Sequence, residues 1–207
     1  MIYGTDPDDL GFIDATCPEM MYYQYLPVYI PGDKIGFSLP ANLKWATEIF
    51  FKALTEIPAT QRPNLYAYLT VKSMYCTPET SNRPGWHSDG FGTDDINFIW
   101  YDSMPTEFCI QDFDLSPDHN KSMAEMAEQA MFHNIEVYPN KHLLMLDQYV
   151  IHRCAPKAPP GYRTFIKISF SKERYNLKGN SHNYGLDYKW DMVERQQERN
   201  HPIANVN

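Results

Sequence analysis

His87 and Asp89 lie two positions apart in the segment "WHSDG", and His152 ends the apolar run "LLMLDQYVIH" much later in the chain. Two imidazoles and one carboxylate around a single ion leave positions open, which is the arrangement of non-haem Fe(II) sites. On an extended segment, side chains two positions apart point to the same side, so His87 and Asp89 can face one ion. These three residues are therefore the predicted metal ligands and the predicted catalytic residues.

Arg163 follows His152 by eleven positions, at the start of the apolar segment "RTFIKISF". Strand alternation places Arg163 and Lys167 on one face of this segment, and Ile166 and Ile168 on the other. A buried charge is costly without a partner, so an inward-facing Arg163 and Lys167 imply an anionic ligand or buried carboxylates. An arginine can hold a carboxylate through two parallel hydrogen bonds. The alternative is an edge strand that carries these charges in water.

The remaining pattern predicts a mainly β (α+β) chain. Residues 41–57 have the apolar spacing of a helix between Pro40 and Pro58, and a Ser122–Glu125 capping box predicts a second helix over 122–132. Short strands with Gly and Pro turns, and no βαβ alternation, favour an antiparallel sandwich or barrel. Residues 20–30 suggest an edge strand, and the polar tail 173–207 suggests a surface helix or a frayed end.

Composition limits the class of protein. A chain of 207 residues with a net charge of −8 fits one domain and argues against general binding of nucleic-acid backbones. The four scattered cysteines indicate unpaired thiols in a reducing compartment. The acidic start of the chain lacks the pattern of a secretory signal, and no apolar run is long enough to cross a bilayer. We expect a cytoplasmic protein without a membrane segment, and the oligomeric state stays open.

The order of "WHSDG" and "IHRCAPKAPPGYR" resembles the Fe(II)- and 2-oxoglutarate-dependent oxygenases, and the H-x-D-G and H-x10-R spacings are most similar to phytanoyl-CoA hydroxylase-like members. The resemblance covers residues 64–172. It implies a single domain over 1–207 with a double-stranded β-helix, a jelly-roll or cupin-like barrel, and flanking helices. It also implies Fe(II) on His87, Asp89 and His152, with 2-oxoglutarate chelating the iron and its far carboxylate held by Arg163.

Other residues are weaker candidates for this site. In the resembling enzymes a polar residue on the strand before H-x-D helps to hold the cosubstrate, which favours Tyr68 and Lys72 here, with Tyr75 as the alternative. Asp147 and Gln148 are candidates to support a ligand histidine. Four aromatic residues are candidates either for the wall of a substrate cavity or for ordinary core: Trp86, Phe91, Trp100 and Tyr101.

The leading interpretation is an oxygenase that hydroxylates a small or anionic substrate with release of succinate and CO2. One alternative is a cupin-like metal-binding isomerase or ligand sensor without oxidation, and another is an oxygenase of the same superfamily that modifies a nucleobase. A β-sandwich interaction module without catalysis is the third. Positive charge gathers after the distal histidine, which suits either an anionic substrate or a solvated strand end: Lys157, Lys167, Lys172, Arg174 and Lys178.

Overall fold

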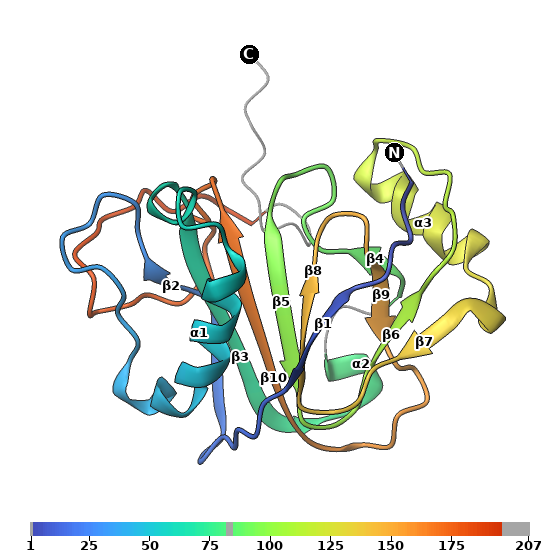
Figure 1. The fold of residues 1–207 in the computed structure, drawn as a ribbon, viewed down its shortest axis with the longest axis horizontal. Helices are drawn as coiled ribbons and strands as arrows, with labels where there is room; N and C mark the ends of the chain where they lie inside the picture. The colour runs from blue at the N-terminus through green and yellow to red at the C-terminus, as the bar shows by residue number, and fades with distance from the viewer. Residues whose placement is uncertain (1, 82–84, 196–207) are drawn as a thin grey trace.

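The computed structural model describes residues 2–81 and 85–195 and is built mainly of two antiparallel β-sheets (Figure 1). The mainly β prediction is therefore confirmed at this level. In spatial order the six-stranded sheet consists of β1 (Asp8–Phe12), β8 (His142–Leu146), β5 (Ile96–Tyr101), β10 (Gly161–Ser171), β3 (Tyr66–Cys76) and β2 (Met21–Tyr29). The four-stranded sheet consists of β4 (His87–Ser88), β9 (Ile151–Cys154), β6 (Thr106–Cys109) and β7 (Ile135–Val137).

Helical segments are short. The predicted helix over 41–57 is a 3-10 turn, η1 (Ala41–Ala46), followed by α1 (Thr47–Glu56). The others are η2 (Arg62–Asn64), α2 (Pro78–Ser81), α3 (His119–Gln129) and η3 (Phe132–Asn134). Within the described ranges, none of these helices has the length and apolar character that a bilayer span requires.

The centre of the six-stranded sheet is the long antiparallel pair of β3 and β10, in which Gly161 lies opposite Cys76 and Ser171 opposite Tyr66. One face of this pair is covered by α1, which lies across β3 in Figure 1. The packed side chains on this face are apolar and come from both elements: Ile49, Phe50, Ala53, Ile166, Ile168 and Phe170. Because all of them are removed from water, this face supplies much of the hydrophobic stabilisation.

The other face of the six-stranded sheet packs against the four-stranded sheet. Phe108 of β6 and Val150, next to β9, cluster with apolar side chains of the larger sheet: Ile99, Tyr101, Leu144, Leu146 and Phe165. Register fixes which residues share this face, because side chains directly opposite in paired strands lie on the same side. Tyr101 lies opposite Phe165, and Lys167 lies opposite Ile99. Arg163 and Lys167 of β10 therefore face the space between the two sheets.

The sheet extends beyond the predicted core of residues 64–172. Both of its edges come from the N-terminal part of the chain, β1 on one side and β2 on the other. β2 includes Pro27, which an edge strand tolerates because its outer backbone donors need no partner strand. β1 was not predicted, because its short sequence "DDLGF" contains no β-branched residue and three residues, two Asp and one Gly, that strands disfavour.

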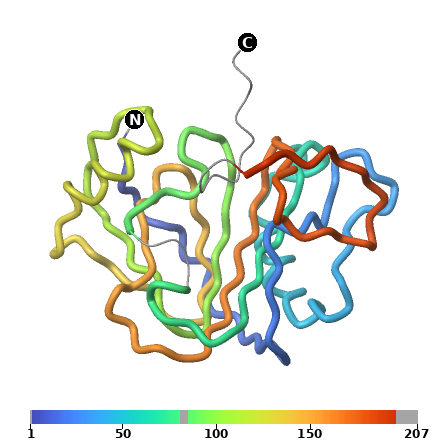
Figure 2. Tube along the Cα trace, turned by 180° about the vertical axis from the view of Figure 1, so that it is seen from behind, coloured from blue at the N-terminus to red at the C-terminus, as the bar shows by residue number. Residues whose placement is uncertain are grey.

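The C-terminal segment differs from the prediction. Within the described part of the tail, residues 173–195, no helix forms; Leu177 and Val193 instead make an isolated parallel bridge. This segment runs beside β2, as Figure 2 shows at the red and blue end of the trace, and the Ser181 amide donates to the Gln24 carbonyl oxygen at 2.7 Å. Trp190 packs against Tyr66 at 5.9 Å between ring centroids. Residues 196–207 of the predicted tail lie outside the described residues.

Candidate metal centre

Strand pairing brings the two histidines together. His87 of β4 and His152 of β9 are directly opposite in the four-stranded sheet, and their ring centroids are 4.5 Å apart. Such opposite residues share a face of the sheet. Phe108 on β6 also lies opposite His152, so this is the inner face, which packs against the larger sheet. The pairing of β4 with β9 therefore brings His87 and His152, which are 65 positions apart in the sequence, into contact.

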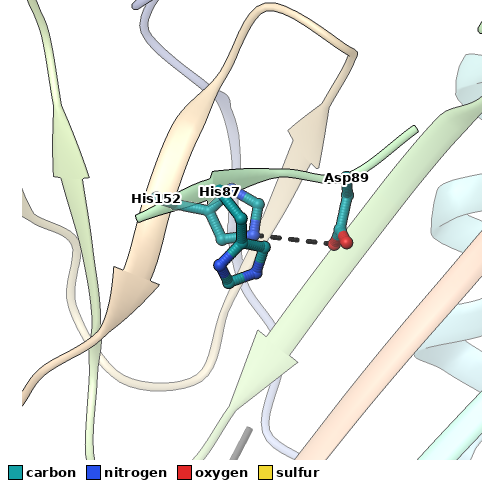
Figure 3. Close-up of side chains that lie close together, drawn as sticks. All are labelled: His87, Asp89 and His152. Carbon is teal, nitrogen blue, oxygen red and sulfur yellow. Dashed lines mark ion pairs between the residues drawn. The ribbon is translucent and has the colours of Figure 1, made fainter. Parts of the chain in front are cut away.

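Asp89 completes the group from the turn that follows β4. Its carboxylate points toward the two rings, as Figure 3 shows, with Oδ2 at 3.6 Å from His152 Nε2. The next residue, Gly90, has a φ of +73°, and a Cβ there would lie 3.0 Å from Thr93 Oγ1 and 3.2 Å from the Asp95 Cβ. Glycine alone combines this backbone conformation with so little room. The glycine of "WHSDG" thus ends the strand at the position that aims Asp89 inward.

Backbone carbonyls orient both imidazole rings. His87 Nδ1 lies 2.9 Å from the Gly85 carbonyl oxygen, and His152 Nδ1 lies 3.2 Å from that of Val150. Because a carbonyl oxygen only accepts, each Nδ1 carries the ring proton and donates it. Each Nε2 then keeps its lone pair, which is the form of histidine that binds a metal ion.

The side chains of Asp147 and Gln148 make no hydrogen bond to a ligand histidine. Gln148 instead supports the loop around Asp89: its carbonyl oxygen accepts from Ser88 Oγ at 2.5 Å, and its side-chain Oε1 accepts from the Gly92 amide at 3.1 Å. The Asp147 carboxylate accepts from the Tyr149 amide at 2.8 Å. The predicted supporting residues therefore position the turn rather than the rings.

Together the three side chains form a donor set for a metal ion. One ligand atom from each of His87, Asp89 and His152 lies within 4.8 Å of the others. The two histidines are buried, and the Asp89 side chain is 19% exposed. Two neutral imidazole nitrogens and one carboxylate suit a divalent transition metal. The three predicted ligand residues therefore fit the divalent ion that they were predicted to bind.

Lys167 contacts one ligand directly. Its ammonium lies 2.7 Å from Asp89 Oδ1 and 3.4 Å from the Tyr25 hydroxyl, and the residue is buried. Burial alone would lower the pKa of Lys167, but the nearby Asp89 carboxylate outweighs it and raises this pKa above its ordinary value. Burial likewise opposes ionisation of Asp89, yet the positive charge of Lys167 holds the Asp89 pKa well below its usual range. The pair is therefore ionised.

Arg163 is also buried, with 1% of its surface exposed. Its Nε donates to the Ser103 carbonyl oxygen at 3.1 Å, while both terminal nitrogens lack a hydrogen-bond partner among the described residues. The guanidinium lies 4.8 Å from the ring centroid of Phe165 and 5.8 Å from that of Tyr101. Burial lowers its pKa, but a guanidinium stays protonated in proteins. The alternative of a solvated edge strand is wrong, because β10 is central and these two cations are buried.

Tyr68 and Lys72 lie on the predicted face of β3 but make other contacts. The Tyr68 hydroxyl donates to the Glu173 carbonyl oxygen at 2.9 Å and accepts from the Tyr175 amide at 3.0 Å. Tyr68 also lies opposite Ser169, six residues and thus about 20 Å along the strand from Arg163. These contacts argue against a cosubstrate-binding role for Tyr68.

Lys72 is nearer to Arg163, because it lies opposite Phe165, and its ammonium donates to the Thr80 carbonyl oxygen. Its cosubstrate role stays a prediction. Tyr75, the alternative, lies on the opposite face of β3, where it is exposed and packs edge-on against Tyr162.

Of the four aromatic candidates, Tyr101 alone contacts one of the two buried cations. Trp100 is on the α1 side of the sheet, where its indole nitrogen donates to backbone oxygens of Ile13 and Lys141, each at 3.1 Å. Trp86 packs beneath the guanidinium of Arg153 at 4.2 Å, and Phe91 stacks on Tyr3 at 5.1 Å. These three residues are best described as packing residues.

The basic residues that follow His152 do not form one cluster, because some are exposed and one is buried. Lys172 and Lys178 are exposed and paired with the carboxylates of Asp94 and Glu194. Lys167 is buried and belongs to the site. The sequence placed Lys167 on the face of Arg163 but gave no sign that Asp89 would be its partner. It gave no sign of Tyr25 either, because this residue comes from a distant edge strand.

Comparisons with known proteins identify no family. No protein-family model matches the chain, and no curated protein matches it. Among solved structures, the chain is similar to the crystal structure of EvdO2 from Micromonospora carbonacea var. aurantiaca, with 12% identity and a TM-score of 0.32. The match covers 60% of this chain and 64% of that chain. At this similarity the likeness carries no conclusion about fold or function, so the functional inference below depends on the site itself.

Proposed function

We propose that this chain is an Fe(II)- and 2-oxoglutarate-dependent dioxygenase that hydroxylates a small or anionic substrate with release of succinate and CO2. The observation that carries the proposal is the pair of buried Arg163 terminal nitrogens without partners. They lie on the same strand face as Lys167, which contacts the metal-ligand candidate Asp89. In this proposal the two antiparallel sheets form a double-stranded β-helix around the site.

The donor set supports iron in particular because His87, Asp89 and His152 provide two neutral nitrogens and one carboxylate oxygen. When bound, the iron would supply the redox centre at which oxidative decarboxylation of 2-oxoglutarate is coupled to substrate hydroxylation. The protein residues hold and orient the reactants. The backbone carbonyls at Gly85 and Val150 keep the imidazoles in the metal-binding tautomer, so that no side-chain rearrangement of the rings is needed on binding.

Arg163 supplies the grip on the cosubstrate. Its two terminal nitrogens form a planar fork that matches the far carboxylate of a dicarboxylic acid through two parallel hydrogen bonds. Because an unpartnered buried guanidinium is costly, an anion at this position removes an unfavourable feature of the fold. The rings of Phe165 and Tyr101 beside the guanidinium keep water away and strengthen the charge attraction.

The charge of the site supports an anionic occupant. Two buried cations, Arg163 and Lys167, face one carboxylate of the ligand set, Asp89. These three groups carry a net positive charge before any metal is added, and a divalent ion increases this charge. A dianionic cosubstrate offsets this charge, and a second anionic group on the substrate would be tolerated for the same reason.

The test is an anaerobic titration with Fe(II) and then with 2-oxoglutarate, followed by the weak visible charge-transfer band of the iron chelate. The wild-type protein is expected to bind iron and to develop the band. Arg163→Met is expected to bind iron equally well but to need at least about tenfold more 2-oxoglutarate for the same band, a difference of about 1.4 kcal/mol. Arg62→Met is the matched control, since Arg62 bonds backbone oxygens outside the site.

Each result of the titration has a defined meaning. Iron binding without the band would favour a metal-binding isomerase or ligand sensor over an oxygenase. No iron binding at all would mean that the His-Asp-His group is not a metal centre. Equal losses of iron and 2-oxoglutarate affinity in Arg163→Met would assign a structural role to Arg163 and remove the main support for the proposal.

A further inference from the structure

The two oxygens of the Asp89 carboxylate have different partners. Oδ1 accepts from the Lys167 ammonium at 2.7 Å, whereas Oδ2 faces His152 Nε2 at 3.6 Å. The oxygen toward the histidines is thus the one directed at the metal position, and the other oxygen is held by a cation of the protein. Because Lys167 comes from the central strand β10, between β5 and β3, its backbone is fixed on both sides.

The surroundings of Lys167 keep its ammonium at Asp89. The Tyr25 hydroxyl lies 3.4 Å from Nζ, and the Tyr25 ring centroid lies 5.6 Å from it. The residues opposite Lys167 on the neighbouring strands are Thr70 and Ile99, and neither carries a charge. Among the described residues, Asp89 is thus the carboxylate that pairs with this buried ammonium, and the ammonium in turn compensates the carboxylate.

The number of oxygens that Asp89 contributes decides how many metal positions remain. A carboxylate bound through one oxygen leaves three positions of an octahedral ion open beside two histidines, and one bound through both oxygens leaves two. The proposed cosubstrate, held through two of its atoms, and the oxidant would together need three open positions. The proposed chemistry therefore requires that Asp89 binds through a single oxygen.

We propose that Lys167 is a resident counter-ion and positioning residue for Asp89. It neutralises the carboxylate while no metal is present, and it retains Oδ1 when a metal binds Oδ2, so that Asp89 acts as a one-oxygen ligand. The first part depends on the metal centre alone. The second part also rests on the proposed use of 2-oxoglutarate.

The proposal predicts that removal of the Lys167 ammonium has opposite effects on the stability of the metal-free protein and on its metal affinity. Removing the ammonium leaves Asp89 buried without a counter-ion, which destabilises the metal-free protein. The same change removes a positive charge that repels the incoming metal ion, so it strengthens metal binding. A lysine with only a packing role would lower stability and metal affinity together. The metal affinity and the stability must therefore be measured on the same variant.

The test compares Lys167→Met, which keeps the length of the side chain, with Lys167→Arg, which keeps its charge. Lys172→Met is the control, because Lys172 forms an exposed pair with Asp94. Fe(II) affinity is measured anaerobically by competition with a chelator, and stability by thermal unfolding with and without metal. Lys167→Met is expected to bind Fe(II) about tenfold more tightly and to unfold at least about 5 °C lower without metal. Lys167→Arg and the control should remain close to wild type.

Unchanged or weaker Fe(II) binding by Lys167→Met would overturn the counter-ion role. If this variant does not fold without metal, Lys167→Gln takes its place, with the same expected signs, because it removes the charge and keeps a donor. At saturating Fe(II), Lys167→Met should also need at least about tenfold more 2-oxoglutarate for the visible band. An unaltered band would overturn the one-oxygen role. If wild-type protein binds iron without any band, the proposed function fails, while the measurements of Fe(II) affinity and stability still decide the counter-ion role.

Discussion

The two faces of β10 differ although both are buried. On the face toward α1, Ile166, Ile168 and Phe170 pack against apolar side chains. On the face toward the smaller sheet, the same strand carries Arg163, Lys167 and Ser169, each less than a tenth exposed. Burying the first set is favourable, whereas burying the second requires partners for every charge and hydroxyl. Hydrophobic burial therefore accounts for the first face, but on the second face it accounts for Phe165 and not for the two cations.

The polar face is itself uneven along the strand. Ser169 donates to the Asn97 side-chain oxygen at 2.7 Å, and Lys167 is paired with Asp89. At the other end of the strand, two terminal nitrogens of Arg163 have no partner in the described part of the chain. The unpartnered positive charge of this face is thus located at the Arg163 end.

The largest expected effect is complete loss of metal binding in His152→Ala. Deleting one of three ligands removes a third of the donor set, whereas the change in unfolding free energy should be smaller than for a core residue on the α1 face. Calorimetric titration with Fe(II) or Zn(II) measures the first quantity and urea unfolding the second. His142→Ala is the control, because this histidine pairs with Asp9 away from the site. Undiminished affinity in His152→Ala would refute the ligand assignment.

On the apolar face, Ile168→Ala should lower the free energy of unfolding by about 2–5 kcal/mol, since it leaves a cavity in a close-packed core. The metal affinity of the folded fraction should not change. Urea unfolding gives the stability, and a metal titration below the unfolding transition gives the affinity. If Ile168→Ala weakened metal binding as strongly as His152→Ala, the two faces would not be functionally separate.

Arg163→Met should stabilise the protein without ligand, whereas a mutation in the apolar core destabilises it. The variant removes two unpartnered buried nitrogens and replaces them with apolar volume, so the free energy of unfolding should rise by about 1–2 kcal/mol in the absence of ligand. Added 2-oxoglutarate should raise the unfolding temperature of the iron-loaded wild type more than that of this variant. A marked loss of stability in Arg163→Met would mean that the guanidinium is a structural requirement.

The smallest effect is expected for Ser169→Ala, which also lies on the polar face. Asn97 would lose its buried donor, and the free energy of unfolding should fall by about 1 kcal/mol. Metal and 2-oxoglutarate affinities should stay at the wild-type values. Altered affinity for either ligand would extend the functional region of β10 beyond Lys167.

The sequence predicted features that depend on local spacing. Alternation in "RTFIKISF" placed Arg163 and Lys167 on the same face, and the structure has them there. The H-x-D spacing identified His87 and Asp89, and the structure brings both to His152. Each inference used only a few neighbouring residues and the two-residue period of a strand.

Apart from the joining of His152 to His87 and Asp89, contacts that depend on non-local pairing were not predicted. The contact of Lys167 with Asp89 arises from the packing of one sheet on the other, and the strand sequences do not encode which ions will meet. The capping of α3 was mispredicted for a different reason, since Asp118 precedes the predicted cap Ser122. Asp118 accepts from the Asn120 and Lys121 amides, so the helix begins one turn earlier and Ser122 is buried within it.

The orientation of both ligand rings by backbone carbonyls has a consequence for mutational tolerance. At position 150 the supporting group is a carbonyl that every amino acid has, so any apolar residue that packs there can preserve the aim of His152. Position 85 is more restricted, because its φ of +78° favours glycine. The centre can therefore persist while most of the residues around it change, and a deep mutational scan should find its neighbours far more permissive than its ligands.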